Sequence, residues 1–227
     1  DSKKKKKLLL LISLISNFGV LAVFKYFNFF ISSLNHIGIN ISDNLLLINV
    51  VVPVGLSFYI FQSIGYTLDV YRNKQIPVKN LIHYAAFVSY FPQLVAGPIE
   101  KVNKLLPQII TPSAITPKIV LSGVLLFSFG FFRKALADSV GEVIDPIFSN
   151  IDSATGDILL LAIFGYGLQI YLDFTGYVDM ARGISRIMGI ELSLNFNAPY
   201  LSSSIREFWT RWHITLSQWL RDNLYIP

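Results

Sequence analysis

The residue best suited to acid–base chemistry in this sequence is His213, in the last third of the chain. An imidazole can remove a proton from an alcohol near neutral pH. Its neighbours mix tryptophans with arginines, which is also typical of an amphipathic helix at a membrane interface. Ser204 has Glu207 three residues on, as a capping box requires, so we expect one helix from there through Trp219. The candidate site residues of this segment are Asn195, Arg206, Glu207, Trp209, Arg211, Trp212, His213 and Ser217.

A second set of polar residues lies in the otherwise apolar stretch 169–182. An aspartate such as Asp173 costs on the order of 2.5–3.5 kcal/mol at the centre of a bilayer, so its side chain should face protein or water. Asp179 and Arg182 are three residues apart, close enough to pair on one helix face. The stretch predicts either a structural ion pair that anchors a helix end or a polar wall beside reacting groups, with Gln169, Asp173 and Asp179 as candidates.

Gln93 lies in a third polar stretch, residues 89–100. Pro92 and Pro98 interrupt the backbone hydrogen bonding there, and lipid cannot supply replacement partners. The stretch therefore predicts either a packed helix break or the wall of a cavity or tunnel that contains Gln93.

Several other kinds of site find no support. The chain has no cysteine, which excludes disulfides, thiolate nucleophiles and cysteine metal ligands. His36, His83 and His213 stand in three separate segments without ligand spacing, so we expect no metal site. There is no glycine-rich phosphate loop and no Gly-x-Ser-x-Gly elbow. The basic residues behind the net charge of +5 sit between apolar runs, which indicates membrane topology and not nucleic-acid binding.

The elements that must position these residues are those of an all-α, polytopic membrane protein. Of the 227 residues, 53% are hydrophobic and 15% charged, against roughly 25% charged in soluble domains. Residues 8–30 would extend about 34 Å as a helix, enough to cross a bilayer. Residues 158–178 make another span, whereas 119–132 are short for one and need a turn before them or after Arg133. Residues 45–68 form a span kinked near Pro53 and Gly55, and 81–99 predict a re-entrant element or two half-helices.

We therefore expect about four to five spanning helices plus re-entrant and interfacial helices. Lys3 to Lys7, the segment 72–118 and the region after Val178 hold most of the basic residues, while 31–44 and 135–157 hold none. By the positive-inside rule, the N-terminus and the C-terminal third face the cytoplasm, and the two loops without lysine or arginine face outward. Both ends of 81–99 then lie on one side, so this segment enters and leaves by the same face.

Four stretches resemble, in order along the chain, the motifs of the membrane-bound O-acyltransferase family. The resemblance is to the branch of alginate O-acetyltransferases and of the D-alanyl-transfer proteins of teichoic acid synthesis. The matching stretches are 52–72, 89–100, 169–182 and 207–217. Any one alone is a weak signal, whereas four in series are specific. They imply a partial fold of this family: a single membrane-embedded domain, 1–227, from a longer chain truncated at both ends.

The resemblance also implies a function. A cytoplasmic thioester donor, acyl-CoA or an acyl carrier protein, would pass an acyl group through a tunnel to a hydroxyl of an extracytoplasmic polysaccharide or cell-wall polymer. His213 matches the first motif histidine, in a supporting role. The principal catalytic histidine lies beyond residue 227, so the 227 residues alone should be inactive. The family's implied partners are the lipid bilayer, an acyl carrier protein and an extracytoplasmic acyltransferase.

Three other interpretations stay open at this stage. The acyl group could be D-alanine and the acceptor teichoic acid. Broken helices and buried aspartates also mark the substrate paths of transporters, although no internal repeat is seen. A scaffold that has lost catalysis is the third.

Overall fold

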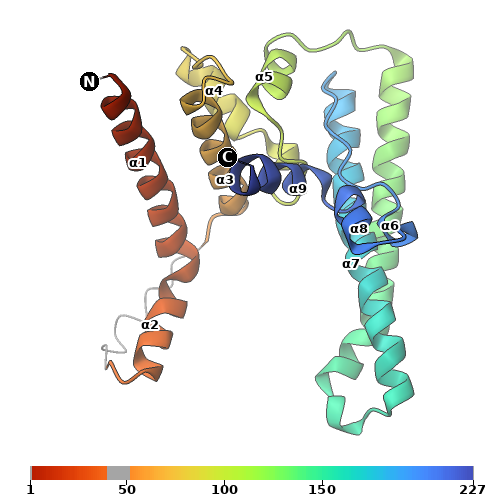
Figure 1. The fold of residues 1–227 in the computed structure, drawn as a ribbon. Coiled ribbons are helices and arrows are strands. Elements are labelled where there is room, and N and C mark those ends of the chain that lie inside the picture. The colour runs from red at the N-terminus through yellow and green to blue at the C-terminus, as the bar shows by residue number, and fades with distance from the viewer. Residues whose placement is uncertain (1, 40–51, 227) are drawn as a thin grey trace.

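The computed structural model describes residues 2–39 and 52–226, and the described part is helical without strands. This confirms the predicted all-α class. Figure 1 shows two long helical bodies with shorter helices between their upper halves. The α-helices are α1 (Ser2–Leu21), α2 (Phe27–His36), α3 (Leu56–Tyr71), α4 (Leu81–Val88), α5 (Val102–Ile110), α6 (Pro117–Ser149), α7 (Gly156–Ile187), α8 (Ile205–Arg211) and α9 (Ile214–Leu220). Short 3-10 turns cover Phe91–Gln93, Ile151–Ser153 and Pro199–Leu201, and π-helical turns cover Ala22–Tyr26 and Arg221–Tyr225.

Three helical segments of the described part are long and apolar enough to cross a membrane: Lys3–His36, Pro117–Ser149 and Gly156–Ile187. The first joins α1 to α2 through the π-helical turn and contains the predicted span 8–30. Of the predicted span 45–68, residues 45–51 lie outside the described residues. Its described part contributes α3, which is 16 residues long and begins after Gly55 in the left-handed conformation, at the predicted kink.

α6 is longer than the apolar run 119–132 that predicted it. The further turns that this short run needs lie after Arg133, because one helix of 33 residues continues through Arg133 to Ser149. The apolar run ends at residue 132 because Arg133 and Lys134 are charged. Both residues form ion pairs with carboxylates of α7. The predicted outer loop 135–157 therefore shrinks to the turn between α6 and α7.

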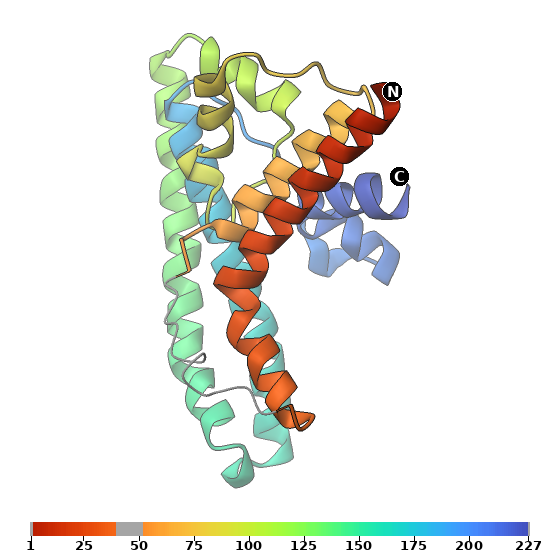
Figure 2. The same ribbon diagram turned by 90° about the vertical axis from the view of Figure 1, so that its left-hand side faces the viewer.

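Glycines bring α6 and α7 into close contact, and the two helices run side by side in both ribbon views (Figures 1 and 2). An added Cβ at Gly130 would lie 2.6 Å from the carbonyl oxygen of Gly176, and one at Gly176 would lie 2.7 Å from that of Gly130. The same reciprocal contact recurs two turns away, between Gly123 and Gly183. Small residues at such crossings let backbones approach within membranes, where no hydrophobic force drives helices together.

The segment 81–99 is broken, as its prolines predict. α4 ends at Val88, a 3-10 turn carries Pro92 and Gln93, and α5 returns to pack against α4. A small buried core of Phe87, Leu105, Leu106 and Leu192 fills the space around this turn-back. Tyr177 ties the break to α7, since its hydroxyl donates to the Pro92 carbonyl (3.3 Å) and accepts from the Val95 amide (3.3 Å).

α8 and α9 are each seven residues long, too short to span a bilayer. They lie between the α6–α7 hairpin and α3 (Figure 1). Aromatic contacts fix both ends of this arrangement: Tyr171 of α7 lies 6.3 Å from Trp212, and Phe61 of α3 lies 4.8 Å from Trp219, between ring centroids. The α6–α7 hairpin and α3 are thus joined through α8 and α9.

Replacing Gly130 by valine in the full-length protein should destabilise it by about 1–3 kcal/mol, because the added atoms meet the α7 backbone, which cannot yield as a side chain does. Thermal unfolding in detergent would measure the loss as a lower melting temperature. Gly19→Val is the matched control, since nothing lies within 4 Å of a Cβ added at Gly19. Equal melting temperatures for the two variants would contradict the close crossing.

Candidate functional site

His213 occupies a break between α8 and α9, not the middle of one helix. The continuous helix expected from the sequence through Trp219 is therefore wrong. α8 does begin at Ser204, whose side chain caps the Glu207 amide at 3.2 Å, but it ends at Arg211. His213 follows in the left-handed conformation, with φ +41°. This conformation costs a non-glycine residue of order 1–3 kcal/mol and persists only where surrounding contacts impose it.

Asn195 supplies those contacts. Its side-chain oxygen Oδ1 accepts hydrogen bonds from the Thr215 amide (3.1 Å) and the Thr215 hydroxyl (2.9 Å), and lies 3.3 Å from His213 Nδ1. Its backbone oxygen accepts from the Ile214 amide at 3.0 Å. Because the Thr215 amide can only donate, Asn195 Oδ1 and not Nδ2 faces the turn. Asn195, which is wholly buried, thus holds His213, Ile214 and Thr215 in place.

The same contacts set the state of the His213 ring. Asn195 Oδ1 can only accept, so His213 Nδ1 carries the hydrogen and Nε2 keeps a lone pair. The ring is 8% exposed and stands edge-on to Phe174, with 4.8 Å between centroids. Burial lowers the pKa of His213 from 6.5 to about 4. The imidazole is therefore neutral at physiological pH, and Nε2 is an acceptor.

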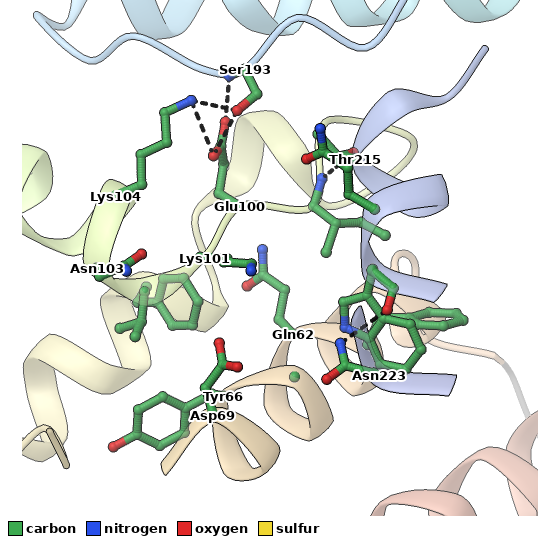
Figure 3. Close-up of a pocket in the computed structure, with 17 residues that line it drawn as sticks. Gln62, Tyr66, Asp69, Glu100, Lys101, Asn103, Lys104, Ser193, Thr215 and Asn223 are labelled. Atoms are coloured by element: carbon green, nitrogen blue, oxygen red, sulfur yellow. Dashed lines mark hydrogen bonds and ion pairs between the residues drawn. The ribbon is translucent and has the colours of Figure 1, made fainter. Parts of the chain in front are cut away.

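A cavity of about 180 Å³ lies on the other side of Thr215 (Figure 3). Its walls come from α3, from the segment 99–104 and from α9 with the turn that follows it. The Thr215 hydroxyl links the two regions, because it accepts from the Ile99 amide (2.9 Å) while donating to Asn195. His213 does not line this cavity, but Thr215, its neighbour in the Asn195 network, does.

Two buried side chains of the cavity wall have polar atoms without a hydrogen-bond partner among the described residues. Gln62 is 3% exposed, and neither its amide nitrogen nor its amide oxygen is paired. The indole nitrogen of Trp219 is also buried and unpaired. Figure 3 shows the Gln62 amide pointing from α3 into the middle of the cavity. An unpaired buried polar group costs roughly 1–3 kcal/mol, so such groups usually meet water or a ligand.

Charged groups surround the cavity. Glu100 is 5% exposed, accepts from the amide and hydroxyl of Ser193, and forms an ion pair with Lys104 at 3.5 Å. Lys101 pairs with Asp222 at 3.1 Å. The side chains of Lys101 and Lys104 are each about half exposed, which leaves two cations where the cavity meets its surroundings.

Residues 72–227 match the family model of MBOAT, the membrane-bound O-acyltransferase family. The chain belongs to this family. It is 42% identical over 219 residues to a probable alginate O-acetylase, AlgI, of Azotobacter vinelandii. The matched region covers 96% of this chain and 44% of that protein. It is 35% identical to a peptidoglycan O-acetyltransferase of Helicobacter pylori (98% and 47% covered) and 30% identical to a teichoic acid D-alanyltransferase of Bacillus subtilis (78% and 46%).

The chain thus spans about half the length of the curated relatives it matches. Family membership and its long apolar helices make it a membrane protein.

In this membrane-bound O-acyltransferase chain, the predicted site residues fall into separate groups. Asn195, His213 and Trp212 come together, with Phe196 packed between the rings at 5.0 Å from Trp212. Ser217 lies just behind, donating to the Trp212 carbonyl at 3.3 Å. On α8, Glu207 pairs with Arg211 at 2.6 Å. The predicted residues Arg206 and Trp209 also lie on α8, and both are exposed.

The polar residues of α7 lie instead against α6. Asp179 forms the predicted pair with Arg182 (3.7 Å), but Arg133 of α6 is its closer partner. Asp173 pairs with Lys134 at 2.8 Å, and its side chain is about half exposed. Gln169 also faces α6, beside Gly141.

Gln93 is fully buried at the helix break, where its amide nitrogen donates to the Phe87 carbonyl at 3.2 Å and its oxygen has no partner. The structure brings neither Gln93 nor the two aspartates of α7 to His213.

The cavity residues were not singled out from the sequence. Gln62 carried a usable signal, because it is an amide within the uncharged run 45–68 and so needs a partner. Thr215 and Trp219 carried none, since a threonine and a tryptophan are ordinary in an amphipathic helix. Only folding shows that α9 brings both to α3.

The buried neutral imidazole makes stability depend on pH. The unfolded chain protonates His213 near pH 6.5 and the folded chain only near pH 4, so stability is full above about pH 6.5 and is lost as pH falls toward 4. Between pH 7 and pH 5 this residue should account for about 2 kcal/mol of lost stability. Thermal unfolding of the full-length protein in detergent at both values measures the loss.

His213→Asn is the reference variant, because asparagine tolerates the left-handed conformation, keeps an amide donor for Asn195 and does not titrate. Its melting temperature should fall less between pH 7 and pH 5 than that of the wild type. Parallel losses in both proteins would show that His213 is not buried in the neutral form.

Proposed function

We propose that the full-length protein is an O-acyltransferase that moves an acyl group, acetyl in the first instance, from a cytoplasmic thioester to a hydroxyl of an extracytoplasmic polysaccharide or cell-wall polymer. The observation that carries the proposal is the family match together with the activities for which two relatives are named, since those at 42% and 35% identity are a probable alginate O-acetylase and a peptidoglycan O-acetyltransferase. The donor is acyl-CoA or an acyl carrier protein, and an acyl carrier protein and an extracytoplasmic acyltransferase are the protein partners we propose.

We place the protein in the cytoplasmic membrane as a single membrane-embedded domain, with the N-terminus and the C-terminal third at the cytoplasmic side. The distribution of basic residues supports this orientation. The return of α5 to α4 supports it too, because the segment 81–99 then begins and ends at one side. Arg133 and Lys134, which disturb the charge pattern, are paired with α7 and so carry little topological weight.

In the reaction, the acceptor oxygen attacks the thioester carbonyl and forms the new C–O bond as the C–S bond breaks. A general base takes the hydroxyl proton, which ends on the departing sulfur. We propose that a histidine further along the full-length chain is this base, because the pKa of about 4 makes His213 a weak one at neutral pH. His213 has the supporting role: its Nε2 accepts a hydrogen bond from an N–H of the acyl donor and so positions the thioester for attack.

The other predicted residues are proposed as walls of the substrate path. Asn195 adjoins His213 directly, and the ring of Trp212 reaches it through Phe196, which contacts both rings. The candidates at a distance from it, along the path to either face, are Gln93, Gln169, Asp173, Asp179, Arg206, Glu207, Trp209, Arg211 and Ser217. Their ion pairs would keep the path polar without leaving single charges in lipid.

D-alanyl transfer to teichoic acid is the second candidate, favoured by the relative named for that activity at 30% identity. Both reactions use the same bond changes and differ in the acyl group and the polymer. Mass spectrometry of cell-envelope glycans, with and without the intact gene, separates them: loss of acetyl esters supports the first reaction and loss of D-alanyl esters the second. Unchanged glycans would contradict both.

In the full-length protein, His213→Ala should lower the rate of acyl transfer about 10²-fold, because the acyl donor loses the group that positions it. Transfer of labelled acetyl groups to the polymer in membrane vesicles measures this. His36→Ala is the matched control, since His36 is exposed and, within the described part of the chain, its ring bonds the Ser32 carbonyl of its own helix. Wild-type activity in His213→Ala would remove His213 from the mechanism.

A further inference from the structure

We propose that a groove between α1 and α3 binds an anionic phospholipid, with the lipid phosphate held by Lys6 and Lys74. The two helices lie side by side in Figure 2. The groove between them measures about 450 Å³, within the roughly 300–1,000 Å³ of small-molecule sites. It is separate from the His213 network, and the proposal does not depend on the acyl-transfer reaction.

Three pieces of the chain form the groove. The residues around Leu9 on α1 make one side, the last turn of α3 makes the second, and the turn 73–77 that follows α3 makes the third. Further along α1, the Ser13 hydroxyl lies 3.3 Å from the Thr67 hydroxyl of α3. This contact joins the helices at the inner end of the groove, so the groove opens toward the start of α1 and the end of α3.

Two ammonium groups of the groove wall have no carboxylate partner. Lys6 and Lys74 are exposed, and within the described residues neither side chain forms an ion pair or a hydrogen bond. The neighbouring Arg72 is already used, since it donates to the Asp222 carbonyl at 2.9 Å. Asp69, close to Lys74 in the sequence, lies in the wall of the other cavity. The described wall of the groove thus holds two cations and no anion, and a phosphate accepts charge-assisted hydrogen bonds from such groups.

Much of the remaining wall is apolar and exposed, which suits a lipid better than a soluble anion. Leu9 is 66% exposed and Ile76 80% exposed, and both line the groove. The most apolar stretch of the helical segment that begins with α1 has no buried residue in the described structure. A hydrocarbon chain can therefore extend from the groove along this helix, whereas a soluble phosphate would leave the apolar side chains in water.

The position of Lys6 along α1 places the groove at the membrane interface. Lys6 and Lys7 are the last of five consecutive lysines, and the uncharged run 8–24 begins directly after them. At such a boundary the stems of lysines lie on apolar surface and their ammonium groups reach the lipid headgroups. Lys74 comes to the same groove from the second basic segment, which the charge pattern places on the same face. We propose the cytoplasmic leaflet, whose anionic lipids attract basic segments of this kind.

The test measures the binding of single lipids to the full-length protein in detergent by native mass spectrometry. The wild type should bind phosphatidylglycerol more tightly than phosphatidylcholine with the same acyl chains, because only the first carries a net charge. Replacing both groove lysines, Lys6→Gln with Lys74→Gln, should raise the Kd for phosphatidylglycerol about 25-fold, at about fivefold for each lysine. The Kd for phosphatidylcholine should not change, because the apolar wall is intact.

Lys4→Gln with Lys79→Gln is the matched control. This pair removes the same two charges from the same two basic segments, but neither lysine lines the groove. Lys4 also lies on a different face of α1 from Lys6, since residues two apart on a helix do not face the same way. The control pair should raise the Kd for phosphatidylglycerol much less than the groove pair.

Equal effects of the two pairs would overturn the proposal, because they would indicate a diffuse attraction to the whole basic surface and not a site. Equal affinity of the wild type for the two lipids would overturn it as well. Displacement of phosphatidylglycerol by glycerol 3-phosphate would assign the groove to a soluble phosphate instead. If the groove pair weakened the binding of an acyl carrier protein and left lipid binding intact, the groove would belong to an acidic protein. Acyl transfer enters none of these measurements, so the proposed function is tested separately.

Discussion

The structure around His213 depends on one carboxamide oxygen. Asn195 Oδ1 accepts from Thr215 twice and from His213 once, and no water reaches it to compete. These bonds hold the histidine in a left-handed conformation that breaks the helix and fix its tautomer. They also place Thr215 in the wall of the cavity. The state of the imidazole and the shape of the neighbouring space are thus set by the same buried group.

The α6–α7 hairpin provides the frame against which this group is held. Arg133 and Lys134 of α6 and Asp173 and Asp179 of α7 are charged residues of its two apolar helices, and lipid would penalise each of them alone. The glycine crossing brings the helices close enough for Arg133 to reach Asp179 and for Lys134 to reach Asp173. Pairing of this kind is weak evidence for stability, because desolvation offsets the attraction. It does explain how an apolar helix continues through two consecutive cations.

The features of the fold that depend on local residue patterns could be predicted from the sequence. Apolar length predicted the first helix and α7, prolines predicted the break after α4, and the series of motifs predicted the family. Features that depend on distant partners were not predictable. Arg133 ended the apolar run of α6, yet the helix continues because α7 supplies its carboxylate. Trp219 and His213 fit one amphipathic helix until Asn195, 18 residues before the histidine, takes the hydrogen bonds that would have continued it.

A structure of the full-length protein with a non-hydrolysable acyl-CoA analogue would test the central claim most directly. The acyl end of the analogue should lie at the break between α8 and α9, within hydrogen-bond reach of His213 Nε2. The Asn195 bonds should be unchanged. An analogue whose acyl end lies away from His213, or a His213 ring turned away from Asn195, would contradict the claim that this network positions the reacting groups.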